Sequence, residues 1–336
     1  MAIRYATVAG NFSDAATWDG GASIPASGDY VYANGFVVVL DTDVNIGSGT
    51  LSTEVCPTTS VGGGKFTFGT NRIVIGNVKA GTSDCLYSTA GAGTTSTLYV
   101  VGNVDGVSPS VCGINQGVSS TKTNTVEIVG NISKYAVRFG RQSSSSRVSF
   151  TLTGNADSTG GYCLVTSLGS VTIASVVVNI NGIVTGNSYE FADPAYYATA
   201  GFGQLGTYTI TGGIVAETAL RVIYCATAIV TGYIENFGGK LAVYASTSFQ
   251  FTSTYYKIQD ADGNDVILYP STTLENPPAE SDVREGVIYG IDDAYEGTLS
   301  VGATPAEFVA ALVESDLGLR MAKCAVTEEV LTMLEN

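Results

Sequence analysis

One repeated pattern constrains the fold of this chain more than any other feature: an alternating apolar strand, then Gly-Asn, then another apolar residue. Clear copies occupy 73–78, 98–104, 126–132 and 150–156, and looser copies, in which no asparagine follows the glycine, occupy 178–183, 208–214 and 229–234. Their glycines are spaced by 20 to 30 residues, which is typical of one coil of a β-solenoid. These glycines are Gly76, Gly102, Gly130, Gly154, Gly182, Gly212 and Gly232.

Glycine and asparagine tolerate positive φ, so we place each Gly-Asn pair at a corner between two strands. The sequence therefore predicts an all-β chain folded as a right-handed parallel β-helix (solenoid). The handedness is taken from the general chirality of parallel crossovers. In the alternative interpretation, Gly-Asn marks the hairpin turns of an antiparallel sandwich. The variable spacing favours the solenoid, because loops inserted at corners leave the stacked strands undisturbed.

Stacked coils would place the asparagines of the four clear copies, Asn77, Asn103, Asn131 and Asn155, above one another. Such a ladder can exchange side-chain hydrogen bonds along the axis. It can also satisfy backbone groups at the corner that no strand reaches.

Composition fits the all-β class and excludes several kinds of chemistry. Glycine is abundant, at 41 of 336 residues, and histidine is absent, which rules out Ser-His-Asp and Cys-His catalysis. The formal net charge is −15, and 255–336 contribute most of it, with 16 acids against 4 bases. A surface this acidic repels phosphate groups, and we therefore expect no nucleic-acid partner. No apolar run approaches the roughly 18 residues of a membrane span, so we expect no membrane partner either.

Three cysteines fit the same repeat. Cys85, Cys112 and Cys163 follow the asparagine of their coils by eight or nine residues, and Ala136 or Val137 holds the matching place in another coil. Small apolar side chains at one inward position favour buried structural thiols, with disulfides or a metal site as the alternatives. Close pairs such as Cys-x-x-Cys do not occur, so we predict no metal and no cofactor.

We predict four segments: an N-terminal β-helix cap over 1–45, the parallel β-helix over 46–254, a linker with a small β block over 255–303, and short helices over 304–336. The cap contains Gly10-Asn11, the single Trp18, Pro25 and Gly28-Asp29. This layout resembles the starting module of G8-type domains and of many bacterial surface and phage appendage proteins. We interpret Trp18 as a plug for the open core, with a sugar-stacking platform as the alternative.

The C-terminal quarter departs from the repeat. After Pro277-Pro278, the run Asp-Val-Arg-Glu-Gly-Val-Ile-Tyr-Gly at 282–290 is similar to a segment of tail-fibre and other virion proteins of tailed phages. A capping box at 304–307 predicts a short amphipathic helix, and a second helix is expected at 327–334. We expect attachment or oligomerisation through the apolar side chains of these helices, or else that the helices fold back as a cap. The apolar residues are Phe308, Val309, Leu312, Val313, Val330, Leu331 and Leu334.

No catalytic residues are predicted. Between 73 and 250 the acids fall mostly one per coil, whereas polysaccharide-cleaving β-helices need two or three carboxylates close together. The loop 187–197 is the best candidate for a glycan or protein contact, with plain loop packing as the alternative. Its candidate residues are Glu190, Phe191, Asp193, Tyr196 and Tyr197. Arg138, Arg141 and Arg147 suggest a solvated loop that balances nearby acids. Asp41-Thr42-Asp43 and the run 260–265 are candidates for calcium binding, because alternating oxygens can chelate a hard cation, and an Asp-Gly turn is the favoured interpretation of the second run.

These observations and the two resemblances lead to one functional hypothesis. We expect a non-enzymatic structural protein on the surface of a tailed-phage virion, either a capsid decoration protein or a fibre-like appendage with an adhesive role. Its expected partners are itself, as a homotrimer, capsid or tail proteins, and host surface glycans. The alternatives are a tailspike-like polysaccharide-degrading enzyme and a bacterial surface adhesin.

Overall fold

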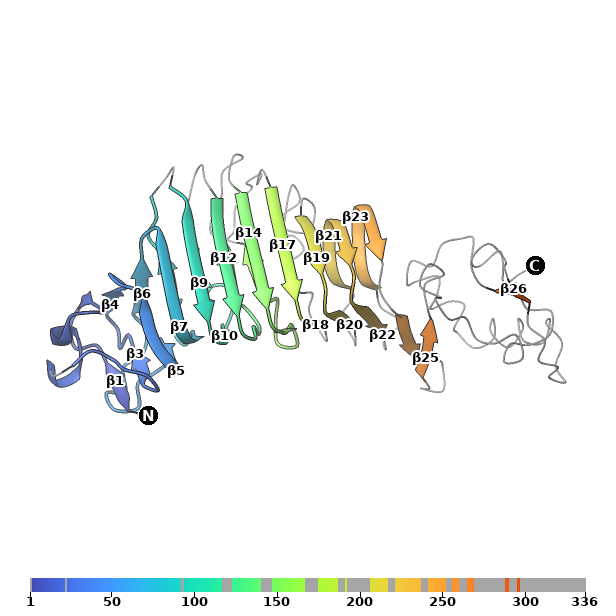
Figure 1. The fold of residues 1–336 in the computed structure, drawn as a ribbon. Coiled ribbons are helices and arrows are strands. Elements are labelled where there is room, and N and C mark those ends of the chain that lie inside the picture. The colour runs from blue at the N-terminus through green and yellow to red at the C-terminus, as the bar shows by residue number, and fades with distance from the viewer. Residues whose placement is uncertain are drawn as a thin grey trace.

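The chain winds as a parallel β-solenoid (Figure 1), as the repeat predicts. The computed structural model describes residues 2–21, 23–91, 94–116, 123–139, 147–166, 175–186, 191, 206–216, 221–236, 241–251, 256–259, 265–268, 288–289 and 295–296. The expected helices over 304–336 lie outside these residues.

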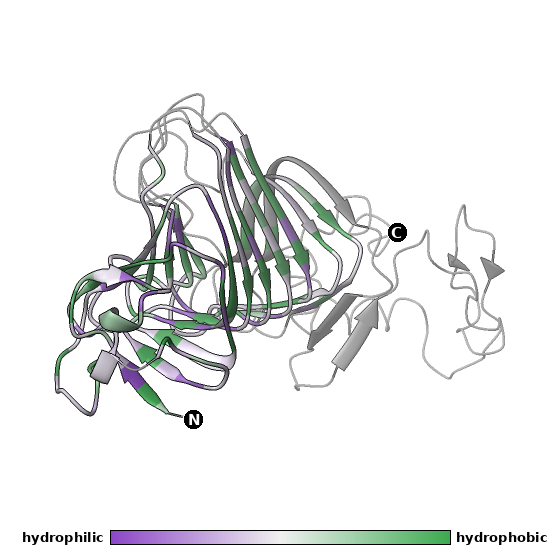
Figure 2. Cartoon of the chain, turned by 60° about the vertical axis from the view of Figure 1, so that its left-hand side comes forward, coloured by the Kyte–Doolittle hydropathy of each residue, from purple (hydrophilic) through white to green (hydrophobic). Residues whose placement is uncertain are grey.

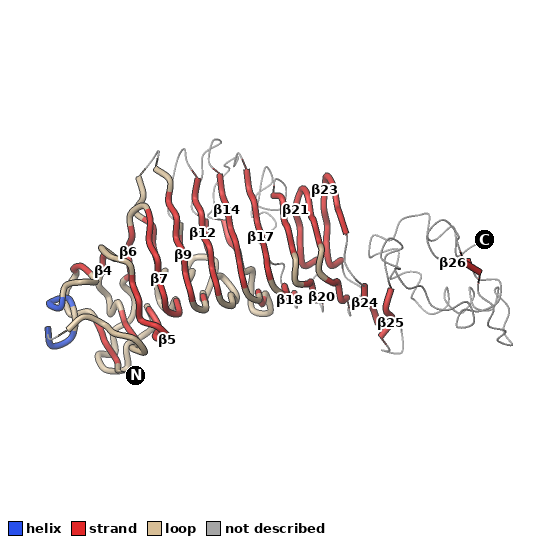
Figure 3. The backbone as a smooth tube through the Cα atoms, in the orientation of Figure 1, coloured by secondary structure: helices blue, strands red, loops and turns tan. Residues whose placement is uncertain are grey.

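The long sheet forms one side of the solenoid. Its strands stack in the order β1 (Ile3–Tyr5), β3 (Tyr30–Tyr32), β5 (Val44–Ser52), β7 (Asn71–Lys79), β9 (Ser96–Val101), β12 (Thr123–Val129), β14 (Arg147–Thr153), β17 (Ser175–Asn181), β19 (Gly206–Ile210), β21 (Arg221–Val230) and β23 (Leu241–Phe251). The short strand β10 (Val104–Asp105) pairs with the end of β7 beyond the corner. These strands follow one another along the solenoid axis (Figure 3).

Two shorter sheets complete the coils. The second sheet stacks β15 (Ala156–Asp157), β18 (Ile183–Gly186), β20 (Gly213–Ala216), β22 (Tyr233–Asn236), β24 (Tyr256–Gln259) and β25 (Asp265–Leu268). The third sheet contains β2 (Gly10–Asn11), β4 (Val37–Val39), β6 (Lys65–Phe68), β8 (Leu86–Ser88), β11 (Ile114–Asn115), β13 (Val137–Phe139) and β16 (Leu164–Thr166). Two 3-10 turns, η1 (Ala15–Thr17) and η2 (Asp19–Gly21), belong to the N-terminal cap, and β26 (Ile288–Tyr289) pairs with β27 (Tyr295–Glu296).

Strand direction decides between the two folds that the repeat allows. Strands of successive coils pair in parallel from β1–β3 to β22–β24, so the antiparallel sandwich is wrong. Antiparallel strand pairing in the described residues comes only at β24–β25 and at β26–β27. Parallel stacking begins at Ile3, so the 1–45 segment is already part of the coil stack, with Trp18 packed at its end. The right-handed winding stays a prediction.

The core is built from columns of inward side chains, one from each coil. One column joins Leu98, Val126, Phe150, Val178 and Tyr208, all fully buried. Hydrophobic and polar residues alternate along the long strands in Figure 2, as expected where one face of a strand packs inside and the other faces out. Each such buried aliphatic or aromatic side chain contributes about 1.5–3 kcal/mol, so the repeated columns drive the coiling.

The glycine at each corner is required by how closely the coils approach. A Cβ atom on Gly130 would lie 2.3 Å from the carbonyl oxygen of Gly102, and one on Gly154 would lie 2.1 Å from that of Gly130. The φ angles of these two glycines are 150° and 144°, which L side chains rarely adopt. The glycine column therefore sets the close contact between coils at this corner.

The predicted asparagine ladder is confirmed. The Oδ1 atom of Asn77 accepts from the backbone N–H of Asn103 at 2.9 Å, and Asn103 and Asn131 repeat the contact with the next asparagine at the same distance. Asn155 closes the series by accepting from Ile183 N at 3.0 Å. Each side chain thus satisfies a corner N–H of the following coil, which is the role that the sequence predicted.

Candidate functional site

The cysteines lie inside the solenoid. Cys85, Cys112 and Cys163 are fully buried and form no disulfide, and Cys56 and Cys225 are fully buried as well, so the expected structural thiols are confirmed for the described residues. The register pairs Leu86 with Ile114, so Cys112 stands one residue before the place opposite Cys85. Burial raises the pKa of the Cys112 thiol to about 12 and raises the pKa values of Cys85 and Cys163 further, so these thiols stay protonated.

A largely buried ionic contact joins three successive coils. Asp84 accepts hydrogen bonds from the backbone N–H of Cys112 at 2.8 Å and from Asn115 Nδ2 at 2.7 Å, both in the next coil. Its other partner is Arg138, one coil further, at 2.5 Å. The two charged side chains are only 12% and 15% exposed. Arg138 therefore does balance a nearby acid, but inside a packed contact and not in a solvated loop; Arg141 lies outside the described residues.

A second polar contact fastens the first coils. Tyr30 donates to Glu54 at 2.6 Å, and Lys79 pairs with the other oxygen of the same carboxylate at 2.9 Å. Burial and then the hydrogen bond to Glu54 raise the pKa of Tyr30 well above its usual range. Burial also acts to raise the pKa of Glu54, but the hydrogen bonds from Tyr30 and Lys79 outweigh it and lower that pKa. This carboxylate is therefore ionised and structural.

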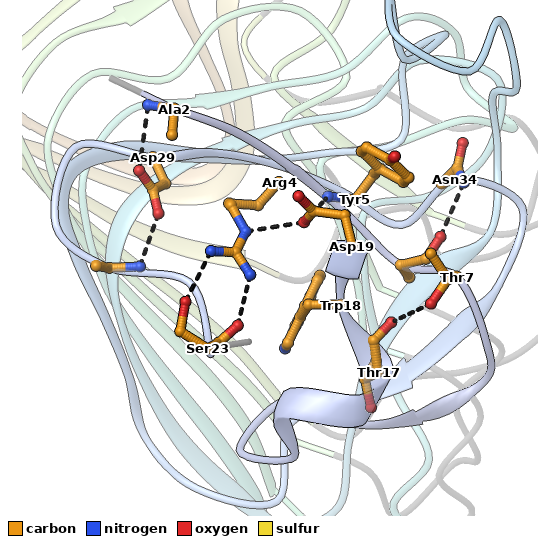
Figure 4. Close-up of polar contacts among 12 residues, drawn as sticks. Ala2, Arg4, Tyr5, Thr7, Thr17, Trp18, Asp19, Ser23, Asp29 and Asn34 are labelled. Carbon is orange, nitrogen blue, oxygen red and sulfur yellow. Dashed lines mark hydrogen bonds and ion pairs between the residues drawn. The ribbon is translucent and has the colours of Figure 1, made fainter. Parts of the chain in front are cut away.

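Figure 4 shows how the N-terminal end is closed. Arg4 pairs with Asp19 at 2.8 Å, and Asp19 also accepts from the backbone N–H of Tyr5 at 3.2 Å, on the edge of β1 that no strand covers. Trp18 is fully buried, donates from Nε1 to Phe12 O at 2.9 Å, and meets the Phe12 ring edge-on. The plug interpretation of Trp18 is confirmed, and this buried ring offers no sugar platform.

The loop predicted for ligand contact is described at one residue. Phe191 is fully buried, with its ring centroid 6.4 Å from that of Phe150 and 6.3 Å from that of Tyr208. Phe191 was therefore wrongly assigned to ligand contact: its ring packs on the core columns. The other candidates, Glu190, Asp193, Tyr196 and Tyr197, lie outside the described residues. So do the seven apolar residues expected to mediate attachment.

The described acids of the coils have structural contacts or stand far apart. Asp105 accepts from the Ser133 hydroxyl, and Asp157 accepts from the backbone N–H of Thr159 at 2.8 Å. The bridges Val104–Ile132 and Ile132–Ala156 place Asp105 and Asp157 two coils apart, or about 10 Å at the usual strand spacing. That backbone separation lies at the upper limit of the roughly 5–9.5 Å that separates the two carboxylates of glycosidases, and both carboxylates already accept structural hydrogen bonds.

Metal binding finds no support among the described residues, where no three His, Cys, Asp or Glu side chains cluster suitably. Asp41 instead accepts from the backbone N–H and hydroxyl of Ser13, and Asp43 accepts from Ile73 N at 2.9 Å. Burial acts to raise the pKa of Asp41, and the bonds from Ser13 lower it below its usual value. Asp41 and Asp43 therefore make structural hydrogen bonds to other segments of the solenoid.

The outward side of the long sheet was missed in the sequence. We call it the outer face and define it by nineteen outward residues of six strands, β9, β12, β14, β17, β19 and β21. Every one of them is half-buried or exposed. In register, they form four columns: Thr123, Arg147 and Ser175; Thr97, Thr125, Ser149, Val177, Thr207 and Thr227; Tyr99, Glu127, Thr151, Asn179, Thr209 and Ile229; and Val101, Val129, Thr153 and Asn181.

Ten of these nineteen residues are Ser or Thr, and the only charges are those of Glu127 and Arg147. The face is thus uncharged on balance and rich in hydroxyls. Aligning the repeats and reading every second residue would have found it.

No family model, curated protein or solved structure matches this chain. Within the described residues, no helix has the length and apolar character needed to cross a membrane. The functional argument therefore rests on the solenoid itself.

Proposed function

We propose that this chain is a non-enzymatic structural protein of a tailed-phage virion, a capsid decoration protein or a fibre-like appendage with an adhesive role. The supporting observation is that polar chemistry in the described coils serves coil-to-coil contacts. Asp84, Glu54 and the asparagine ladder each join neighbouring coils. A rod held together in this way suits a mechanical role on a particle surface.

The similarity of 282–290 to tail-fibre segments supplies the virion context of the proposal. In it, residues 275–336 attach the protein to its sisters or to the particle, and the assembled form is a homotrimer. Truncation after Leu274 tests the attachment. The shortened chain is expected to lose trimeric mass or incorporation into particles. If it assembles and incorporates normally, the C-terminal segment is only a cap.

Immunogold labelling of particles produced from the encoding genome tests the location. The proposal expects label on the particle surface, whereas complete absence of the protein from purified particles would overturn it. Incubation with host capsular or lipopolysaccharide glycans tests the enzymatic alternative. Release of oligosaccharides would favour a tailspike-like enzyme.

A further inference from the structure

The outer face of the long sheet offers a surface on which another protein could pack. Its residues belong to six consecutive strands held in continuous parallel register. Val129 and Val177, which lie on this face, are 37% and 38% exposed. In Figure 1, no described element lies over the labelled strands from β9 to β17 on the side toward the viewer.

The net charge of the outer face determines which kind of partner can pack against it. The whole chain carries −15, of which 255–336 hold −12, so two copies repel each other mainly through the charge of that segment. On the outer face, the single negative charge of Glu127 is balanced by that of Arg147. Two copies can therefore meet there without net repulsion, whereas a basic partner would find no complementary charge. The depletion of charge and the presence of Tyr99 are typical of the centre of a protein interface.

The area of the face is also sufficient. β9, β12, β14, β17 and β19 contain 6, 7, 7, 7 and 5 residues, and the part of β21 that pairs with β19 contains four. At about 4.8 Å between strands and about 3.3 Å along each strand, the face covers about 570 Å² per copy. Two copies would bury about 1,100 Å² together, just above the roughly 1,000 Å² expected of a biological interface. Thr and Val have restricted χ1 rotamers, so ordering them on association costs little entropy.

We propose that the outer face of the long sheet is the surface through which this chain associates with a second copy of itself. This inference rests on the self-association included in the proposed function, and it assigns the contact to the described solenoid in addition to 275–336. The hydroxyls of Thr125, Ser149 and Thr151 would make hydrogen bonds across the contact around the apolar Val129 and Val177.

The test introduces like charges on this face. V129E/V177E places two acids on it, and V107E/V55E is the matched control, because Val107 and Val55 are exposed valines (47% and 54%) away from the long sheet. Sedimentation velocity of the full chain at micromolar concentration should show an oligomer for the natural protein and the control, and at least a tenfold weaker association for V129E/V177E. Unchanged far-UV circular dichroism and melting temperature would verify that all variants fold.

A charge-swap experiment makes the test specific. Mixing V129E/V177E with V129K/V177K should restore association, because opposite charges then meet across the contact. The inference is overturned if V129E/V177E assembles like the natural chain, or if the natural chain is a monomer. Binding of a neutral glycan array by a monomeric natural chain, lost in V129E/V177E, would assign the face to glycans instead. Incorporation into particles is scored separately, so a monomer that still reaches the particle refutes this contact and the homotrimer, and leaves the proposed role on the virion standing.

Discussion

Removal of the Asp84 carboxylate is expected to be a strongly damaging change among the polar contacts of the described coils. Asp84→Ala deletes the acceptor for Cys112 N and Asn115 Nδ2 and leaves Arg138, only 15% exposed, without its counter-charge. Breaking one side of a buried ion pair costs about 3–5 kcal/mol. Two neutral donors, Cys112 N and Asn115 Nδ2, also lose their acceptor, at a cost of about 1–3 kcal/mol each. Because local relaxation restores some of these hydrogen bonds, the total loss of stability stays at about 3–5 kcal/mol.

The assay is urea unfolding followed by far-UV circular dichroism, with a double-mutant cycle of Asp84→Ala and Arg138→Met. We expect Asp84→Ala to lower the free energy of unfolding by about 3–5 kcal/mol. The double variant should recover part of the loss, since no unpaired charge remains, and so give a coupling energy above about 1 kcal/mol. Glu127→Ala, on the outer face, is the control and should change stability by less than about 0.5 kcal/mol. A loss below about 1 kcal/mol for Asp84→Ala, or additive single effects, would refute the three-coil contact as a stabilising unit.

Three further predictions follow from the coil geometry. Gly130→Ala should destabilise the fold by more than about 2 kcal/mol in the same urea assay, because its Cβ would lie 2.3 Å from Gly102 O, whereas Gly69→Ala, with open space around it, should be nearly neutral. Asn131→Ala removes the acceptor for Asn155 N and should cost about 0.5–1.5 kcal/mol, with faster amide exchange at that N–H as the local readout. Cys112 has a raised pKa in the folded state, so the unfolded chain loses its proton first, and stability should fall by about 1.4 kcal/mol per pH unit from about pH 9 to 12. In Cys112→Ala, the decrease in the free energy of unfolding per pH unit should be smaller by that amount. An identical pH dependence in the variant and the natural protein would contradict the assigned burial of Cys112.

Periodic features of this fold were accessible from the sequence, because a solenoid repeats its local rules in every coil. The Gly-Asn corners predicted the ladder from Asn77 to Asn155, and the spacing of Cys85 and Cys163 predicted their burial. The Asp84–Arg138 pair was inaccessible, because the partners are 54 residues apart and only the three-dimensional register brings them together.

Phe191 shows the opposite failure. An aromatic residue in a long loop suggested ligand contact, but its ring packs against Phe150 and Tyr208 and lies fully inside the core. Sequence alone does not distinguish a loop aromatic that faces solvent from one that folds back onto the coil. Cys112 gives a smaller example, since a one-residue difference in loop length moves it out of register with Cys85.

The glycine column makes the length of this rod adjustable in whole steps. Excision of 131–154 would join Gly130 directly to Asn155, so the corner keeps its Gly-Asn pair and Asn103 meets the N–H of Asn155 in place of that of Asn131. β12 would then lie beside β17, with Val126 against Val178 inside and Thr125 against Val177 outside. The rod would shorten by one strand spacing, about 4.8 Å, with its two ends unchanged, although Asp84 would lose Arg138, which lies on the excised coil. A lineage that carries this fold can therefore change its reach by duplicating or losing single coils, without redesigning either end.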